Sequence, residues 1–143
     1  MSKPWLAHYD ADVRASIAPY PEKTLVDYLD QLASAHPSKP AILFKGSTMT
    51  YAQLGAESTA FAAALVEMGV RRGDRVALVL PNCPQFLVAE FGTWKAGAVV
   101  VALNPTYTER ELEQALSSTG AETVVALTAF YKDRKSTRLN SSH

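Results

Sequence analysis

The sequence has little cysteine and no long apolar run, and both shortages narrow the kinds of protein that it can encode. Cys83 is the only cysteine among 143 residues, which excludes an internal disulfide and fits a reducing compartment. No apolar run approaches the ~20 residues of a membrane-spanning helix, and the N-terminus lacks the apolar stretch of a secretion signal. We therefore expect a cytoplasmic protein without a transmembrane segment.

The chain also has no excess of positive or negative charge. The chain has 14 Lys and Arg against 14 Asp and Glu, so it carries no basic footprint and we expect no nucleic-acid partner. The motifs G-x-x-x-x-G-K-[ST], G-x-G-x-x-G and G-x-S-x-G are all absent, so no sequence motif for a triphosphate or a serine nucleophile is present. His8 and His36 are too far apart to suggest a metal site.

What the chain does contain is a strand–helix–strand pattern from Arg75 to Pro105. The segments 76–80 and 98–103 are short apolar runs without alternation, which is typical of parallel strands buried on both faces. Between them, residues 84–96 place Leu87, Phe91 and Trp94 at helical spacing and end before Gly97. We predict a right-handed βαβ unit with these three side chains on its apolar helix face.

The flanking segments extend this pattern into a larger α/β domain. A helix is predicted from Thr24 to Pro37, then a hairpin of strands 41–44 and 47–50 that turns at Gly46. Capping boxes at Thr50 and Thr108 predict two further helices, and residues 122–127 form another apolar strand candidate. The apolar faces expected for the first two helices are Leu25, Tyr28, Leu29, Leu32 and Ala35, and Leu54, Phe61, Leu65 and Met68. The alternation favours an α/β fold with a mainly parallel sheet flanked by helices.

Three segments are expected along the chain, with one hydrophobic core among them. Residues 1–23 are predicted to be an N-terminal arm, because prolines interrupt scattered apolar residues there. Residues 24–132 form the domain. The tail 133–143 has one apolar residue and resembles translated sequencing-adapter read-through, so we expect the natural chain to continue differently after about Lys132. A disordered natural C-terminus is the alternative.

Two loops occupy the places where open parallel sheets bind ligands, beyond the carboxyl ends of the strands. They are residues 81–84 and 104–107, which carry Asn82 and Asn104. Capping of the following helix by Asn82 or Cys83, with Pro84 in its first turn, is the interpretation that we favour over ligand contact. Cys83 could also be a nucleophile near a helix N-terminus, but we expect a packed thiol.

The remaining charged residues have structural explanations in the sequence. Arg71 and Arg72 could form an anion site, but we expect them to lie in a solvated loop because turns are ordinarily polar. The acidic residues Glu109, Glu111 and Glu113 suit a capping box and a helix N-terminus, and Lys95 suits the last turn of a helix.

Several ordered motifs resemble the N-terminal part of an adenylate-forming acyl-CoA synthetase, and they are most similar to bacterial long-chain fatty-acid–CoA ligases. The resemblance covers residues 4–131. It is carried by the leader Trp5-Leu-Ala-His-Tyr-Asp10 with Ser16-Ile-Ala-Pro-Tyr-Pro-Glu22, by Met49-Thr-Tyr-Ala-Gln-Leu54, by Gly73-Asp-Arg-Val-Ala77 with Leu80-Pro-Asn82, and by Trp94-Lys-Ala-Gly-Ala-Val-Val-Val-Ala-Leu-Asn-Pro105. Met49 and Gln53 depart mildly from the usual first core motif, Leu-Thr-Tyr-x-Glu-Leu.

The resemblance implies that residues 24–132 are part of an AMP-binding (adenylation) domain. The full enzyme would activate a fatty acid with ATP and Mg²⁺ to an acyl-adenylate and pass the acyl group to coenzyme A. Aryl-CoA ligases and peptide-synthetase adenylation domains share the core motifs, and only the leader favours fatty acids. The family's catalytic parts lie downstream, so we carry no catalytic, cofactor-binding or metal residue over to this chain.

The resemblance also implies that the fragment alone is inactive and binds none of these cofactors. The family's N-terminal arm can join subunits, which implies a homodimer, and peripheral membrane contact is compatible with it. The alternative interpretation is a small, self-contained α/β binding or interaction module without catalysis.

Overall fold

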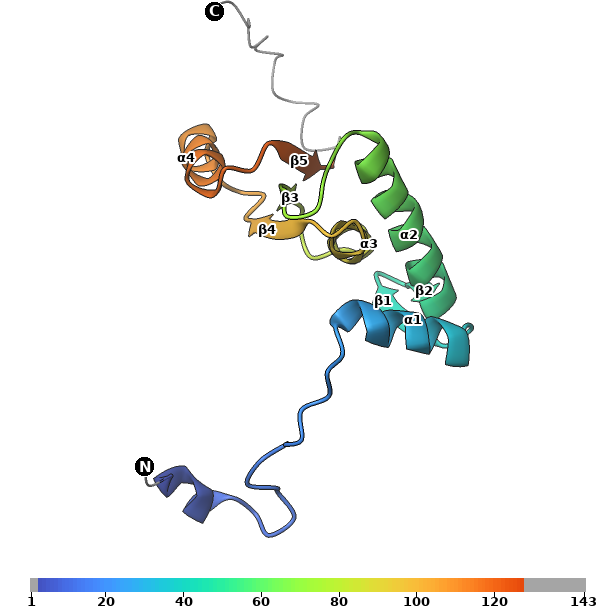
Figure 1. Cartoon of the computed structure of the whole chain (residues 1–143), viewed down its shortest axis with the longest axis vertical. Helices are drawn as coiled ribbons and strands as arrows, with labels where there is room; N and C mark the ends of the chain where they lie inside the picture. The colour runs from blue at the N-terminus through green and yellow to red at the C-terminus, as the bar shows by residue number, and fades with distance from the viewer. Residues whose placement is uncertain (1–2, 128–143) are drawn as a thin grey trace, which may run out of the picture.

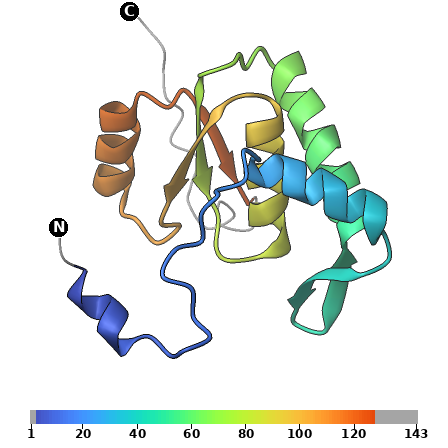
Figure 2. The same ribbon diagram turned by 60° about the horizontal axis from the view of Figure 1, so that its bottom comes forward.

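A three-stranded parallel sheet with helices on both faces forms the body of the protein, in a computed structural model that describes residues 3–127 (Figures 1 and 2). The strands β3 (Arg75–Val79), β4 (Val99–Leu103) and β5 (Thr123–Ala126) lie in the order β4-β3-β5. Helices α2 (Tyr51–Glu67) and α3 (Pro84–Lys95) cover one face, and α4 (Glu109–Thr119) lies on the other. The predicted α/β class with a mainly parallel sheet is confirmed.

Burial differs sharply between the strands. Val76, Ala77 and Leu78 of β3 are fully buried, because β3 has a strand on each side and helices above and below. Val99 of β4 is 48% exposed. The prediction that both strands of the βαβ unit are buried on both faces is therefore wrong for β4, which is an edge strand with one neighbour in the described sheet.

Small residues bring α2 and α3 into close contact. A Cβ placed on Gly92 would lie 2.7 Å from Phe61 Cδ1 and 2.8 Å from the Ser58 carbonyl oxygen, so only glycine fits there. The buried residues of α3 are Ala89, Gly92 and Thr93. The predicted buried face of Leu87, Phe91 and Trp94 is wrong, since all three are half-buried and the small residues face the neighbouring helix instead.

Three more apolar positions, Met68, Leu25 and Tyr28, are exposed against expectation. Met68 is 75% exposed at the C-cap of α2, beside Gly69, which adopts the positive φ of 95° suited to the residue after a helix. Leu54 and Leu65 of the same predicted face are buried. In the first helix, α1 (Leu25–Ala35), only Leu29 is buried, while Leu25 and Tyr28 are exposed because no described segment covers that end.

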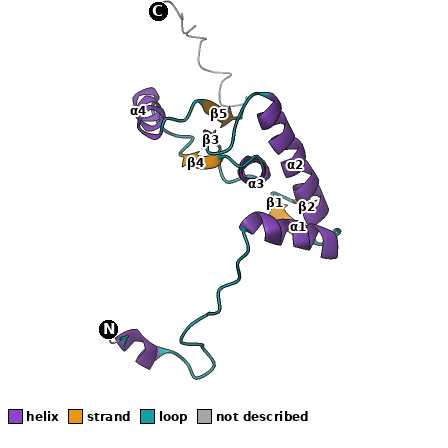
Figure 3. Ribbon diagram, in the orientation of Figure 1, coloured by secondary structure: helices purple, strands orange, loops and turns teal. Residues whose placement is uncertain are grey.

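The N-terminal region precedes this body (Figure 3). A short 3-10 helix, η1 (Pro4–His8), and extended chain lead to α1, and none of its residues is buried. The predicted hairpin is confirmed as β1 (Pro40–Phe44) and β2 (Ser47–Thr50). Both turn residues, Lys45 and Gly46, have positive φ, as two-residue hairpin turns of the favoured hand require.

Three helices begin with a complete capping box. In each box the threonine hydroxyl accepts the backbone N–H three residues on, and the side chain at that third position accepts the threonine N–H. The pairs are Thr24–Asp27, Thr50–Gln53 and Thr108–Glu111. The boxes predicted at Thr50 and Thr108 are confirmed. Among residues 3–127 no helix combines the length and apolar character needed to cross a membrane, and the predicted tail 133–143 lies outside the described residues.

Candidate functional site

The loops after β3 and β4 meet at one hollow, as parallel neighbours require. Val79 pairs with Leu103, so the residues that follow each strand emerge at the same edge of the sheet. The hollow has a volume of about 430 Å³. It is lined by Leu80, Pro81, Asn82, Phe86, Ala102, Leu103, Asn104 and Pro105. The structure thus brings together Asn82 and Asn104, the two polar residues predicted for this edge.

The side-chain amide oxygen of Asn104 forms hydrogen bonds within its own loop. Its Oδ1 accepts hydrogen bonds from Thr106 N at 3.0 Å and from Thr106 Oγ1 at 2.8 Å. This local turn fixes the loop and leaves the amide nitrogen of Asn104 as the group able to donate to a ligand. Asn82 is exposed.

The start of α3 matches the prediction only in part. Pro84 occupies the first helical position, as predicted, where its missing N–H needs no partner, and Phe86 N donates to Cys83 O at 3.0 Å. Cys83 is the N-cap residue, but its side chain makes no capping hydrogen bond. The expectation that Asn82 or Cys83 caps this helix through its side chain is therefore wrong. Cys83 is half-buried and does not line the hollow.

The chemistry of the hollow is that of amides and apolar side chains. No residue lining it is ionisable, so its groups can donate and accept hydrogen bonds and cannot act as a general acid or base. Within residues 3–127, no cluster of three His, Cys, Asp or Glu is placed to hold a metal ion. That this chain carries no catalytic, cofactor-binding or metal residue stays a prediction.

The sheet order adds a distinction between the two loops. The chain passes from β3 to β4 on one side and then crosses back past β3 to β5. The order of the strands therefore reverses at β3, and the crevice favoured for ligands lies between the carboxyl ends of β3 and β5. Only the Asn82 loop borders that crevice, whereas Asn104 follows β4 on the other side.

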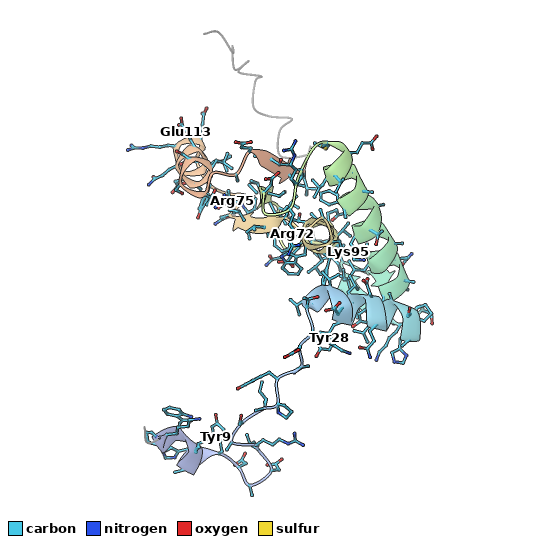
Figure 4. The ribbon with its side chains drawn as sticks, viewed as in Figure 1. Tyr9, Tyr28, Arg72, Arg75, Lys95 and Glu113 are labelled. Carbon is cyan, nitrogen blue, oxygen red and sulfur yellow. The ribbon has the colours of Figure 1, made fainter. Side chains whose placement is uncertain are left out.

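The sequence predicts only that Lys95 lies in the last turn of a helix, whereas in the structure its side chain joins three helices. Its ammonium lies 2.9 Å from Asp30 Oδ1 of α1 and donates to Thr59 Oγ1 at 2.9 Å and to Gly55 O at 3.3 Å, both on α2 (Figure 4). The Lys95 side chain is 11% exposed. No local motif could have signalled this junction, because its members come from three different helices.

Glu90, on α3, lies in a less favourable environment for its charge. The half-buried position raises the pKa of the Glu90 carboxyl above its ordinary value, because desolvation disfavours the ionised form. Glu90 does not line the hollow at the strand ends. It therefore adds no acid or base to the candidate site.

Comparison with known proteins agrees with this architecture. The long-chain-fatty-acid–CoA ligase of Escherichia coli O6:H1 is 44% identical over 131 residues, which is 91% of this chain and 23% of that relative. The ligase of the same name from Bacillus subtilis is 41% identical over 125 residues, 87% of this chain and 22% of the relative. The chain thus spans less than a quarter of the length of these relatives.

Solved structures give the same picture at the level of the fold. The N-terminal domain of FACL13 from Mycobacterium tuberculosis is 35% identical with a TM-score of 0.67, over 71% of this chain and 26% of that one. The NpsA N-terminal subdomain from Klebsiella oxytoca is 28% identical with a TM-score of 0.69, and the match covers 80% of this chain and 29% of that one. The profile of the AMP-binding enzyme family matches residues 29–142, and the chain therefore belongs to the AMP-binding enzyme family.

Proposed function

We propose that this chain is the N-terminal part of a long-chain fatty-acid–CoA ligase. The observation that carries the proposal is the 44% identity to such a ligase over 131 residues, which is 91% of the chain. The ligase would activate a fatty acid with ATP to an acyl-adenylate and pyrophosphate, and then transfer the acyl group to the thiol of coenzyme A. The alternative of a self-contained binding module is not favoured by these relatives.

Within that enzyme, residues 3–127 serve as scaffold. The hollow at Asn82 and Asn104 offers hydrogen-bonding amides and no ionisable group, so its role is contact with a ligand or with the remaining sequence. We assign ATP and its Mg²⁺ to the phosphate loop and carboxylate that the family resemblance places downstream. Coenzyme A enters as the second substrate of the same full-length enzyme, and we place that enzyme in the cytoplasm.

We also propose that the arm joins two copies into a homodimer. Its support is the set of large apolar side chains that the arm leaves exposed. They are Trp5, Tyr9, Val13, Ile17 and Tyr20. An arm that buries none of its residues on its own body gains stability by burying them elsewhere.

Palmitate-dependent exchange of pyrophosphate into ATP tests the ligase assignment. The full-length gene product is expected to show exchange, and the 143-residue chain is expected to show none, because the nucleotide-binding parts are missing from it. Reactions without palmitate, and with benzoate in its place, are the controls. Exchange by the 143-residue chain would refute the scaffold role, and exchange by the full-length protein with benzoate alone would refute the fatty-acid assignment.

A further inference from the structure

A second hollow lies at the opposite end of β4 from the Asn82–Asn104 hollow. The first turn of α1 forms one wall, the loop from α3 to β4 forms the other, and the volume is about 710 Å³. The apolar part of its lining consists of Leu25, Val26, Trp94, Ala96 and Ala98. Leu25 is 60% exposed, so part of this apolar wall faces solvent in the isolated chain.

The second hollow carries one free positive charge. Lys95 lines it, but the Lys95 ammonium is paired with Asp30 at 2.9 Å. Arg72 also lines the hollow and makes no side-chain hydrogen bond or ion pair with any residue of 3–127. No acidic residue lines the hollow. A partner that brings carboxylates flanked by apolar side chains would therefore complement it.

The N-terminal arm contains a segment of that kind at residues 9–13. Tyr9 and Val13 are 46% and 50% exposed, and the exposed residues Asp10 and Asp12 lie between them. Val13 N donates to Asp10 O at 3.0 Å, so residues 10–13 form a single turn. Neither aspartate forms an ion pair or a side-chain hydrogen bond within the part of the chain that the structure describes.

These two surfaces do not meet within one chain. Figure 4 shows Tyr9 on the arm that projects away from the body, and Arg72 on the body itself. Thr24, where the arm joins α1, lines the second hollow. When fully extended, the residues between Tyr9 and Thr24 span up to ~50 Å, which is long enough to reach an adjacent copy.

We propose that residues 9–13 of one copy dock in the second hollow of another copy, with Asp10 and Asp12 at Arg72. Tyr9 and Val13 then lie against the apolar wall. The exchange is reciprocal, because in a two-fold dimer each arm meets the hollow of the other chain. This inference rests on the proposed homodimer and adds the surface that receives the arm.

Reversal of the charge on either side of the contact should weaken the dimer. The arm variant Asp10→Lys/Asp12→Lys and the hollow variant Arg72→Asp each place like charges opposite one another at both contacts. We expect each variant to raise the dissociation constant of the dimer about tenfold, measured by sedimentation equilibrium. All three positions are exposed, so the core of the body stays intact.

An equimolar mixture of the two variants tests whether the contact joins different chains. In a mixed dimer the reversed arm meets the reversed hollow and the unaltered arm meets the unaltered hollow, so both contacts are complementary. The mixture should therefore dimerise within about threefold of the wild-type affinity, although neither variant does so alone. An arm that docks on its own body predicts no recovery, because each variant chain keeps its own repulsive contact.

Two arginines outside the contact provide matched controls. Arg71→Asp alters the neighbour of Arg72, which does not line the hollow. Arg14→Gln alters the arm next to the 9–13 segment. Each control should change the dissociation constant less than about threefold, as exposed charges without a partner do.

The outcomes separate this contact from the homodimer itself. A wild-type chain that stays monomeric would overturn both. A dimer that is lost on deletion of residues 1–22 but withstands both charge reversals would overturn the contact alone. A mixture that does not recover, or an equal loss in Arg71→Asp and Arg72→Asp, would also overturn it. A dimer that the 143-residue chain forms and the full-length gene product does not would assign the hollow to downstream sequence, against the proposal.

Discussion

The ammonium of Lys95 holds three helices at one point. It pairs with Asp30 on α1 and donates to Thr59 and Gly55 on α2, while its own backbone ends α3. Asp30 is 59% exposed in its side chain and the hydrogen bond to Thr59 is also exposed, so solvent screens both, whereas the hydrogen bond to the Gly55 carbonyl is partly buried. We therefore expect the hydrogen bonds to α2 together to contribute more to the junction than the ion pair does.

We predict that Lys95→Met lowers the free energy of unfolding by about 1–2 kcal/mol, because it keeps the apolar stem but removes these bonds. Asp30→Asn should cost less than about 1 kcal/mol, as screened pairs do. Chemical denaturation at neutral pH measures both. Lys39→Met, at an exposed lysine, is the control and should stay within about 0.5 kcal/mol. A Lys95→Met loss inside that same range would show that the junction does not stabilise the fold.

Among the elements, the three capping boxes differ in one chemical respect. Those of α1 and α4 use the carboxylates Asp27 and Glu111, whereas the box of α2 uses the amide of Gln53. Hydrogen bonds from the Thr24 and Thr108 backbones, and then from their hydroxyls, lower the pKa of Asp27 and of Glu111 below the ordinary values of 3.8 and 4.5. The capping boxes of α1 and α4 therefore contain a titratable group, and the capping box of α2 does not.

The sign of the pH effect follows from these lowered pKa values. A carboxylate whose pKa is lower in the folded state stabilises the protein above its ordinary pKa, and this contribution is lost as pH falls through the folded value. We predict that the double variant Asp27→Asn, Glu111→Gln loses less stability than the wild type between pH 5 and pH 3, measured by urea unfolding. Gln53→Glu is the converse variant and should steepen the acid loss. Parallel pH profiles for all three proteins would contradict the assignment.

The boxes also show which elements a sequence can predict. Thr50 with Gln53 and Thr108 with Glu111 are three residues apart, so the chain itself fixes their geometry, and both were predicted. The contact of Gly92 with Phe61 and the bonds of Lys95 join different helices, and nothing local signals them. The sequence therefore predicts that the face of α3 with the bulky side chains is buried, whereas in the structure the face that contains Gly92 is buried.

The same division holds for the candidate sites. Asn82 and Asn104 were predicted to share one edge because parallel strands end together. The hollow between the first turn of α1 and the loop from α3 to β4 was not predicted, because its walls come from three separate segments, around residues 25, 72 and 96. The order β4-β3-β5 separates the Asn104 loop from the crevice between β3 and β5. This order depends on the side of β3 on which the connection through α4 places β5, and no sequence motif signals that side.

At the scale of the whole molecule, the arm adds nothing to the core of the body, and its contacts with α1 through Lys23 are exposed. Residues 3–23 contain no buried side chain, and Figures 1 and 4 show the arm projecting away from the helices and sheet, with Tyr9 far from α1. The sheet and its helices contain the described core, which is built from residues such as Leu65, Val76 and Leu78. The stability of the body should therefore be independent of the arm, and association between copies should depend on it.

We predict that deleting residues 1–22 changes the unfolding free energy of the monomeric body by less than about 1 kcal/mol, because the deletion exposes no core. The intact chain should sediment as a dimer, with a stability that rises with protein concentration, and the deletion should abolish both effects. Sedimentation and denaturation at two concentrations measure this. Dimers that persist without the arm would contradict the proposal, as would an intact chain that is monomeric throughout.

The burial of residues 76–79 of β3 also has a consequence for the order in which the chain is synthesised. Val76 pairs with Val100 on one side and with Thr123 on the other, and both partners come later in the chain. At a synthesis rate of about 5–20 residues per second, β3 emerges from the ribosome about one to five seconds before β4 does, and waits about as long again for β5. Until β4 emerges, an apolar strand without either neighbour is available to chaperones and to other nascent copies, and until β5 emerges one of its edges stays unpaired.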